Sequence, residues 1–314
     1  MAVAFIMPGQ GSQSIGMGKS LYENFTSAKD VFNEVDDALN QKLSQLMFNG
    51  DIEELTLTYN AQPAIMTVSI AVIRVMESMG LDVSKSVSVM AGHSLGEYSA
   101  LCAAGVYSLS DTARLLRARG NAMQNAVASG VGAMCAIIGL DIENIEQICF
   151  DVSRGDEICQ IANDNGAGQV VISGHKSSVE RAVELVKDAG AKRAVFLPVS
   201  APFHCSLMQP AADIMKNELS NVKSCDPVVG IIPNINVVLQ KDAKEIPDLL
   251  VQQVTGRVRW RETVQWFAEN GIDIVYEIGW GKVLTNLVKR IDKNIQAETV
   301  YETTEIEKCV EGLC

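Results

Sequence analysis

The feature that most constrains the fold is a serine between two glycines, Gly92-His93-Ser94-Leu95-Gly96. The apolar residues 87–91 before it predict a buried strand, and the run that begins at the serine predicts a helix. A G-x-S-x-G sequence in this context is typical of a sharp turn that lifts the serine hydroxyl into a cleft. The alternative is a glycine-rich turn whose serine only caps the helix. The first interpretation predicts an α/β fold.

The rest of the chain supports a large α/β body. Residues 3–7 predict a short buried strand that ends at Pro8, and residues 63–79 carry apolar side chains at helical spacing. Further strands are predicted at 230–235 and 274–277. With 314 residues, of which 47% are hydrophobic, the chain is long enough to bury a substantial core. Strands that alternate with helices in this way indicate a parallel sheet.

A stretch in the middle of the chain has a different order of elements. Strands are predicted at 134–140, 158–163, 169–174 and 194–199, with helices at 142–152 and 179–189. The order β-α-β-β-α-β is that of a ferredoxin-like unit, which buries one face of its sheet under two helices. We therefore expect two domains: an α/β-hydrolase-like catalytic body formed by residues 1–129 and 199–314, and a ferredoxin-like small subdomain formed by residues 130–198.

Composition argues against several classes of function. No apolar run is long enough to cross a bilayer, and the N-terminus lacks the features of a signal peptide, so we expect a cytoplasmic protein with no membrane partner. The formal net charge of −12 disfavours nucleic-acid binding. The eight cysteines are scattered singly, which predicts reduced thiols and no metal site.

Positive charges gather late in the chain despite the acidic total. The residues are Arg257, Arg259, Arg261, Lys282, Lys289, Arg290 and Lys293. The simplest interpretation is a solvated face. If these side chains converge in space, they form a surface that receives an anionic partner.

A serine nucleophile needs a base, and the chain has only three histidines. His93 adjoins the serine, but neighbours on a sharp turn point in different directions, so we expect it beneath the turn. His175 opens a predicted helix and is expected to be a solvated cap. His204 follows a predicted strand in a loop stiffened by prolines and is the best candidate for the base.

Three arginines share one predicted helical segment: Arg114, Arg117 and Arg119. A guanidinium group on that helix could bind a carboxylate through two parallel hydrogen bonds. Composition alone does not decide which of the three faces a cleft.

Four sequence motifs together resemble those of the malonyl-CoA:acyl carrier protein transacylases. They are PGQGSQ at 8–13, GHSLGEYSA at 92–100, PVSAPFHC at 198–205 and GWGKVL at 279–284. The motifs occur in the family's order and span nearly the whole chain. The resemblance implies that Ser94 is the nucleophile, His204 the base and Arg119 the group that binds the substrate carboxylate. It also assigns the oxyanion hole to the backbone N–H groups of Gln10 and Leu95.

The resemblance implies two further roles and shows two departures. The main-chain carbonyl of Gln253 would orient the histidine, where many serine enzymes use an aspartate. Phe203 would narrow the pocket against a branched methylmalonyl group. Trp280 stands where the family often has proline, and Gly256-Arg257 replaces a small residue followed by proline. These departures concern the loop that positions the Gln253 carbonyl.

The implied reaction is a ping-pong transfer of malonyl from malonyl-CoA to the phosphopantetheine thiol of acyl carrier protein, in fatty acid biosynthesis. It requires no cofactor, and we expect a monomer whose partners are the carrier and the coenzyme A thioester. One alternative is a serine thioesterase or hydrolase on the same turn, which would release free acid. Others are an inactive module that kept the fold, and an acyltransferase of a polyketide pathway.

Overall fold

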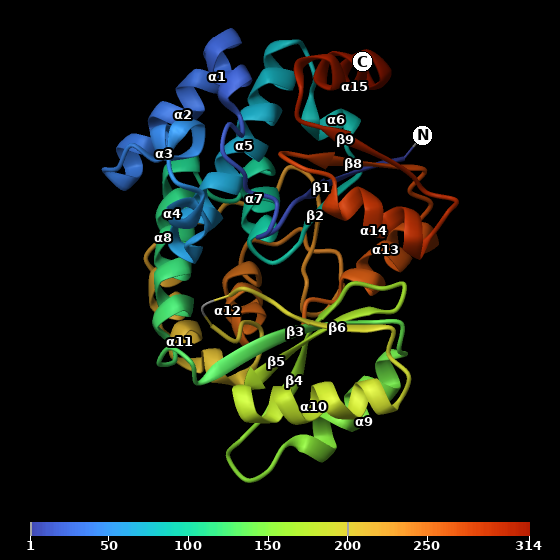
Figure 1. Cartoon of the computed structure of the whole chain (residues 1–314). Helices are drawn as coiled ribbons and strands as arrows, with labels where there is room; N and C mark the ends of the chain where they lie inside the picture. The colour runs from blue at the N-terminus through green and yellow to red at the C-terminus, as the bar shows by residue number, and fades with distance from the viewer. Residues whose placement is uncertain (1, 200) are drawn as a thin grey trace.

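The computed structural model describes residues 2–199 and 201–314 of the chain. They form a mixed α/β structure with a parallel sheet and a smaller antiparallel sheet (Figure 1). The parallel sheet has five strands in the order β7-β2-β1-β8-β9, and each neighbouring pair is parallel. Ser200, which belongs to the motif at 198–205, lies outside the described residues.

The parallel sheet has hydrophobic layers on both faces. Along β1, alternate side chains belong to two different clusters: Val3, Phe5 and Met7 to one, Ala4 and Ile6 to the other. The first cluster includes the long helices α5 and α8, and the second includes α13 and α14. Because a strand points successive side chains to opposite faces, a strand buried on both sides must be apolar throughout, as β1 is.

The elements of the body are these: β1 (Val3–Met7), α1 (Lys19–Asn24), α2 (Thr26–Leu39), α3 (Leu43–Asn49), α4 (Ile52–Thr56), α5 (Thr58–Ser78), α6 (Val83–Ser86), β2 (Val89–Gly92), α7 (Leu95–Ala103), α8 (Leu109–Asn125), η1 (Ser206–Met208), α11 (Gln209–Ser220), β7 (Ile231–Ile232), α12 (Ile246–Thr255), α13 (Trp260–Glu269), β8 (Ile274–Ile278), α14 (Val283–Ile291), β9 (Gln296–Val300) and α15 (Thr303–Leu313).

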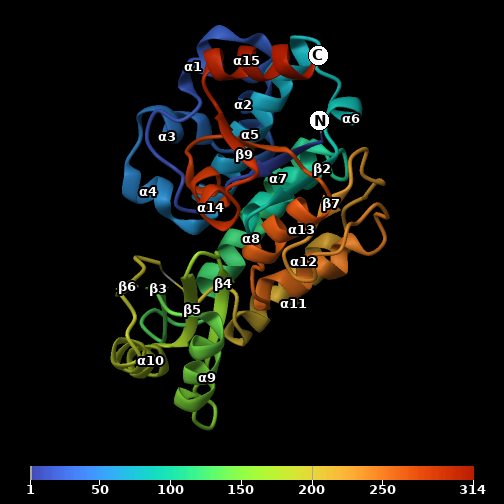
Figure 2. The same ribbon diagram turned by 90° about the vertical axis from the view of Figure 1, so that its right-hand side faces the viewer.

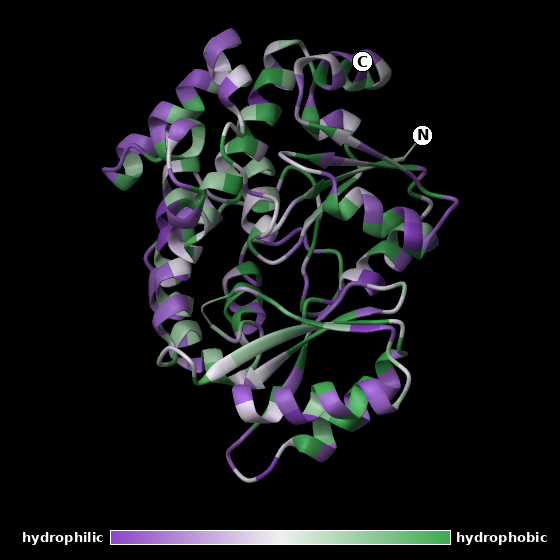
Figure 3. Ribbon diagram, viewed as in Figure 1, coloured by the Kyte–Doolittle hydropathy of each residue, from purple (hydrophilic) through white to green (hydrophobic). Residues whose placement is uncertain are grey.

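The small sheet is built from one continuous stretch of chain. Its elements are β3 (Gly132–Ile138), α9 (Ile142–Val152), β4 (Cys159–Asp164), β5 (Gln169–His175), α10 (Lys176–Asp188) and β6 (Arg193–Phe196). The strand order is β4-β5-β3-β6, and all three pairs are antiparallel. Figure 2 shows α9 and α10 on the side away from the body. In Figure 3 both helices alternate green and purple along their length, as expected for helices with one buried face.

The structure confirms a mixed α/β fold and the predicted order of elements in the middle of the chain, but several boundaries differ. The helix predicted at 63–79 begins five residues earlier, at Thr58, and has Pro63 inside it. The strand predicted at 230–235 has only two paired residues. Pro233 has no N–H to donate to a neighbouring strand, so pairing ends before it. The sequence analysis missed α12 and the edge strand β9 altogether.

Among the described residues, no helix combines the length and the apolar character needed to span a bilayer.

Candidate active site

Ser94 lies on a strained turn between β2 and α7. Its φ is 53° and its ψ −110°, a backbone conformation that an L-residue rarely adopts. The turn is closed by Gly92 and Gly96: a Cβ on Gly92 would overlap the backbone of Gly96, and a Cβ on Gly96 would overlap the carbonyl oxygen of Met7. The glycines therefore allow the close approach of β2, α7 and the end of β1, as the motif predicts.

His204 reaches the nucleophile from the loop between β6 and η1. Its Nε2 is 2.8 Å from the Oγ of Ser94, although 110 residues separate the two in sequence. Its Nδ1 lies 2.9 Å from the backbone carbonyl oxygen of Gln253 on α12. That carbonyl can only accept, so Nδ1 carries the proton and Nε2 is left free to take the proton of the serine.

The imidazole of His204 is held in its neutral form. It is 4% exposed. Burial, and next the positive charge of Arg119, lower the pKa of His204 to about 3. A neutral imidazole is the form that accepts a proton, so His204 can act as a proton acceptor throughout the neutral range.

Arg119, on α8, is the arginine that enters the cleft. It is 1% exposed, its Nη2 lies 3.2 Å from the Oγ of Ser94, and it also donates to the side chains of Gln62 at 2.9 Å and Gln253 at 2.8 Å. The guanidinium also lies over the ring of Tyr98, 5.5 Å from its centroid. Its Nε has no partner among the described residues, and no carboxylate pairs with it directly. A buried cation of this kind is suited to bind an acid group brought by a ligand.

The other two arginines of the segment face elsewhere. Arg114 forms an ion pair with Asp111, 3.2 Å away, on the exposed side of α8. Arg117 stacks over Tyr59 at 5.5 Å. The structure thus selects Arg119 from the three candidates.

The remaining histidines have other contacts. The Nε2 of His93 lies 2.9 Å from the Oδ1 of Asn165, which follows β4, so this imidazole pairs with the small sheet's loop. His175 is the first residue before α10, but its side chain does not cap that helix. Its Nδ1 instead accepts a hydrogen bond from the backbone N–H of Ile158 at 3.0 Å, so the prediction of a solvated cap is wrong. This bond joins the ends of β4 and β5.

A cavity of about 260 Å³ brings the other predicted residues together. Gln10, Leu95 and Phe203 line it together with Ser94, His204 and Arg119. Gln10 comes from the loop after β1, and Leu95 is the first residue of α7, where backbone N–H groups are free of helix partners. The rest of the lining is largely apolar and includes Met123, Met134, Leu197 and Val199.

A polar network lies behind Ser94 and was not predicted from the sequence. Asn234 follows β7; its Oδ1 accepts from the N–H of Ser94 at 2.7 Å and its Nδ2 donates to the carbonyl of Gly92 at 2.7 Å. Glu97 accepts from the N–H of Asn234 at 2.9 Å and from the side chain of Gln253 at 2.7 Å. Glu97 stands within a quoted motif, but nothing in the sequence around Asn234 distinguishes it from an ordinary loop residue.

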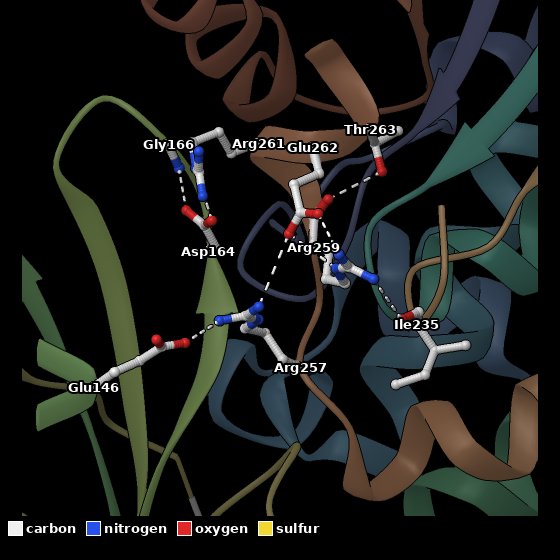
Figure 4. Close-up of polar contacts among 9 residues, drawn as sticks. All are labelled: Glu146, Asp164, Gly166, Ile235, Arg257, Arg259, Arg261, Glu262 and Thr263. Carbon is white, nitrogen blue, oxygen red and sulfur yellow. Dashed lines mark hydrogen bonds and ion pairs between the residues drawn. The ribbon is translucent and has the colours of Figure 1, made fainter. Parts of the chain in front are cut away.

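Three arginines of the late run of positive charges have carboxylate partners (Figure 4). Arg257 pairs with Glu146 at 2.6 Å, Arg261 pairs with Asp164 at 2.8 Å, and Arg259 pairs with Glu262. These three arginines therefore have carboxylate partners within the fold, and the hypothesis that the run receives an anionic partner stays a prediction.

Two of these pairs lie where the small sheet meets the body, at a contact that we call the junction. It consists of the pairs Arg257–Glu146 and Arg261–Asp164 and the backbone of Val258. The N–H of Val258 donates to Ala162 at 2.8 Å, and its carbonyl accepts from Asp164 at 2.9 Å, so the segment before α13 runs beside β4. The junction begins four residues after Gln253 and fixes the linker that contains the Gly256-Arg257 departure.

Among the described residues, no cluster of three or more histidine, cysteine, aspartate or glutamate side chains has the arrangement of a metal site.

Comparison with known proteins agrees with this geometry. Residues 4–307 match the family model described as acyl transferase domain. The chain is 45% identical to the malonyl CoA-acyl carrier protein transacylase of Bacillus subtilis, over 99% of this chain and 97% of the relative. The chain belongs to the acyl transferase family, among the malonyl-CoA:acyl carrier protein transacylases. The resemblance found in the sequence is thus confirmed.

Solved structures of transacylases share the whole fold. The acyl-carrier-protein S-malonyltransferase of Bartonella henselae superimposes with a TM-score of 0.98 at 60% identity, covering 100% of this chain and 99% of that one. A malonyl-transacylase solved in complex with its type II PKS acyl-carrier protein superimposes with a TM-score of 0.96 at 43% identity, covering 99% of this chain and 100% of that one.

Proposed function

We propose that this chain transfers the malonyl group of malonyl-CoA to the phosphopantetheine thiol of acyl carrier protein through a malonyl ester on Ser94. The observation that carries the proposal is the meeting of three groups at one atom: the Oγ of Ser94 lies 2.8 Å from His204 and 3.2 Å from Arg119. A nucleophile, its base and a buried cation for an acid group are the parts that such a transfer needs.

In the first half-reaction, the Oγ of Ser94 attacks the thioester carbonyl carbon while the Nε2 of His204 takes the hydroxyl proton. The backbone N–H groups of Gln10 and Leu95 donate to the oxygen that becomes negative, and the position of Leu95 at a helix N-terminus supports this role. The carbon–sulfur bond then breaks, and His204 gives its proton to the departing sulfur of coenzyme A.

In the second half-reaction, the thiol of the carrier gives its proton to His204, and its sulfur attacks the ester carbonyl of malonyl-Ser94. The ester bond breaks, and the Ser94 oxygen takes the proton back. Water would compete with the thiol, and the largely apolar lining of the cavity limits its access. The reaction needs no cofactor in this scheme.

Selectivity for malonyl follows from Arg119 and Phe203. An acetyl group would leave the buried guanidinium of Arg119 without an acid partner, which costs on the order of a few kcal/mol. Phe203 lines the same cavity and would exclude a methyl branch on the acyl chain.

The proposal also covers the domains, the partners, and the location and oligomeric state of the protein. The body comprises residues 1–129 and 199–314 with an α/β-hydrolase-like arrangement, and residues 130–198 form a ferredoxin-like subdomain, which the strand order β4-β5-β3-β6 supports. The partners are the carrier, as in the transacylase solved with its carrier, and the coenzyme A thioester. We further propose that the protein is a monomer and that it is cytoplasmic; the eight free cysteines agree with a reducing compartment.

Mass spectrometry of the intact protein tests the central step. Incubation with malonyl-CoA should add one malonyl group, located on the peptide that contains Ser94, and the Ser94→Ala variant should acquire none. Ser99, which is buried on the same helix, offers a matched control: Ser99→Ala should still be malonylated. Malonylation that persists in Ser94→Ala would overturn the proposal.

The rival activity is hydrolysis of the thioester, as in a serine thioesterase. Hydrolases of this type commonly orient the histidine with a carboxylate, whereas the Nδ1 of His204 faces a main-chain carbonyl. Incubation of the malonyl-enzyme with and without the carrier separates the two. If the enzyme is a transferase, malonyl-carrier should form in the sample with the carrier, and the malonyl ester should remain stable in the sample without the carrier. Rapid release of free malonate in both samples would indicate a hydrolase.

A further inference from the structure

Glu97 is a buried carboxylate that the proposed reaction does not use. It lies on α7, one turn after the nucleophile, and only 2% of it is exposed. One of its oxygens, Oε2, accepts from the backbone N–H of Asn234 at 2.9 Å and from the Nε2 of Gln253 at 2.7 Å. Burial of a carboxylate without a directly paired cation is costly, so its presence here calls for a reason.

The side chain of Gln253 connects Glu97 to Arg119. Its Nε2 donates to Glu97 and to the carbonyl of Ser94, the latter at 3.0 Å, and its Oε1 accepts from the Nη2 of Arg119 at 2.8 Å. Above its pKa of about 7 the carboxylate of Glu97 is ionised and can only accept hydrogen bonds, and the carbonyl of Ser94 can only accept at any pH. Both groups therefore select the amide orientation in which the NH₂ group of Gln253 faces them. The amide oxygen must then face Arg119. The reverse orientation would set two donors against each other at the guanidinium.

Electrostatics supports the same connection. Burial lowers the pKa of Arg119, and the charge of Glu97 is among the influences that raise it. Burial raises the pKa of Glu97 to about 7, against the lowering effects of Asn234, Gln253 and Arg119. The two charges therefore stabilise each other across the amide, without forming a direct ion pair that would occupy the guanidinium.

The contact of Gln253 with His204 is separate. It is made by the main-chain carbonyl, whose position is set by helix α12, whereas the contact with Arg119 is made by the side chain. A change at Glu97 therefore releases the amide and leaves the backbone of α12 in place.

We propose that Glu97 is a positioning residue that orients Arg119 through the side chain of Gln253, and so sets the preference for malonyl over acyl groups without a carboxylate. The inference rests on the proposed function. It assigns to Glu97 no contact with the substrate and no proton transfer.

The test measures kcat/KM of the full chain for malonyl-CoA and for acetyl-CoA. In Glu97→Ala the malonyl-to-acetyl ratio should fall by about tenfold, because a misplaced guanidinium loses its bidentate geometry. Inactivation by an uncharged fluorophosphonate, which reports the reactivity of Ser94 with His204, measures separately any loss that the substitution causes through Asn234. Such a loss lowers kcat/KM for both substrates equally and leaves the malonyl-to-acetyl ratio unchanged. Glu97→Gln keeps an oxygen that can accept from Gln253 and should restore most of the ratio.

Two further variants keep the test decisive. Glu97→Asp retains the charge but moves the carboxylate oxygens away from Gln253 by the length of one methylene group. Its malonyl-to-acetyl ratio should therefore fall as it does in Glu97→Ala, and this variant replaces the alanine variant if the latter folds poorly. Glu277→Gln is the matched control. Glu277 is also fully buried, but it accepts from the N–H groups of Leu284 and Thr285 at the start of α14. Its replacement should lower stability and leave the ratio unchanged.

Binding to the Ser94→Ala background separates this inference from the proposed function. There, Glu97→Asp should weaken malonyl-CoA binding measured by calorimetry and leave acetyl-CoA binding unchanged. If the wild-type enzyme forms no malonyl-serine, the proposed function fails, whatever Glu97 does. If it forms the ester but Glu97→Asp keeps the wild-type ratio and the wild-type affinities, the inference about Glu97 is overturned and the function stands.

Discussion

The polar groups around Ser94 and those of the junction are the same kinds of side chain in opposite settings. At the junction each arginine has a carboxylate beside it: Arg257 meets Glu146 and Arg261 meets Asp164. Around the nucleophile, Arg119 is buried more deeply than either and has only amide and hydroxyl partners among the described residues. One region has its charges matched within the fold, and the other has a buried cation without a carboxylate partner, which the malonyl group would supply in the proposed reaction.

This difference predicts which property each region controls. Matched pairs contribute to stability according to their burial, and partly exposed ones contribute little. An unmatched buried cation costs stability but favours a ligand of opposite charge. Substitutions around Ser94 should therefore change activity or selectivity, and substitutions at the junction should change stability alone.

The largest effect is expected from His204→Ala. The rate of Ser94 malonylation should fall by about 10³-fold, because the hydroxyl loses the base that takes its proton. Rapid-quench measurement of the ester checks this. His175→Ala is the control: it removes a histidine from the small sheet and should leave the rate unchanged. A malonylation rate in His204→Ala within tenfold of wild type would contradict the role of the base.

The next effect concerns Arg119. In Arg119→Ala, kcat/KM for malonyl-CoA should fall by roughly 100-fold, and the value for acetyl-CoA should fall far less, because only malonyl has an acid group for the guanidinium. Arg114→Ala, on the exposed side of the same helix, should leave both values unchanged. Equal losses for the two substrates would show that Arg119 supports the turn and does not recognise the carboxylate.

The pH dependence of Ser94 reactivity probes the burial of His204. Its imidazole is faced by Arg119, by the Gln253 carbonyl and, further away, by His93, and its pKa is lowered to about 3. Protonation would stop the base, so the rate of fluorophosphonate inactivation should stay nearly constant down to pH 5. An ordinary histidine would cause a roughly 30-fold loss at that pH. A fall centred near pH 6.5 would contradict the burial of the base.

The same lowered pKa has a consequence for stability. The unfolded chain binds a proton to this histidine near pH 6.5, whereas the folded chain does so only near pH 3. The contribution of His204 is therefore present above pH 6.5 and is lost as the pH falls from there towards 3. The His204→Gln variant should lose less stability than wild type between pH 7 and pH 5, as measured by urea unfolding at each pH.

At the junction, Asp164→Ala should lower the free energy of unfolding by about 2 kcal/mol, because the buried carboxylate accepts from both Arg261 and the N–H of Gly166. Urea denaturation checks the loss. The malonyl-to-acetyl ratio should not change. A changed ratio at unchanged stability would mean that the two regions are not separate.

The smallest effect is expected from Arg257→Ala. Its partner Glu146 has a side chain that is 54% exposed, so the loss of stability should be at most about 0.5 kcal/mol and should diminish at high salt. Because Arg257 is already paired, KM for the carrier should stay constant. A higher KM would instead support the hypothesis that this arginine receives the carrier.

The features that could be predicted from the sequence alone also differ between the regions. Ser94 and the order of elements in the small sheet could be predicted because they follow from local patterns: a turn between two glycines and alternating apolar periods. His204 could be chosen as the candidate base because the chain has only three histidines. The roles of Arg119 and Gln253 came from resemblance, because no local pattern shows that residues far apart in sequence meet. The carboxylates of the junction were missed because ion pairing depends on tertiary contact, and Asn234 was missed because an isolated asparagine in a loop is common.

The position of β1 has a consequence for biosynthesis. This strand is made first but lies third of five in its sheet, between β2 and β8, and the latter begins at residue 274. One edge of β1 therefore has no strand beside it until nearly the whole chain has left the ribosome. Residues 132–196 form a sheet of short-range contacts and can fold well before that. We expect the nascent body to remain open to aggregation, and to recruitment of chaperones, until the residues from 274 onwards arrive.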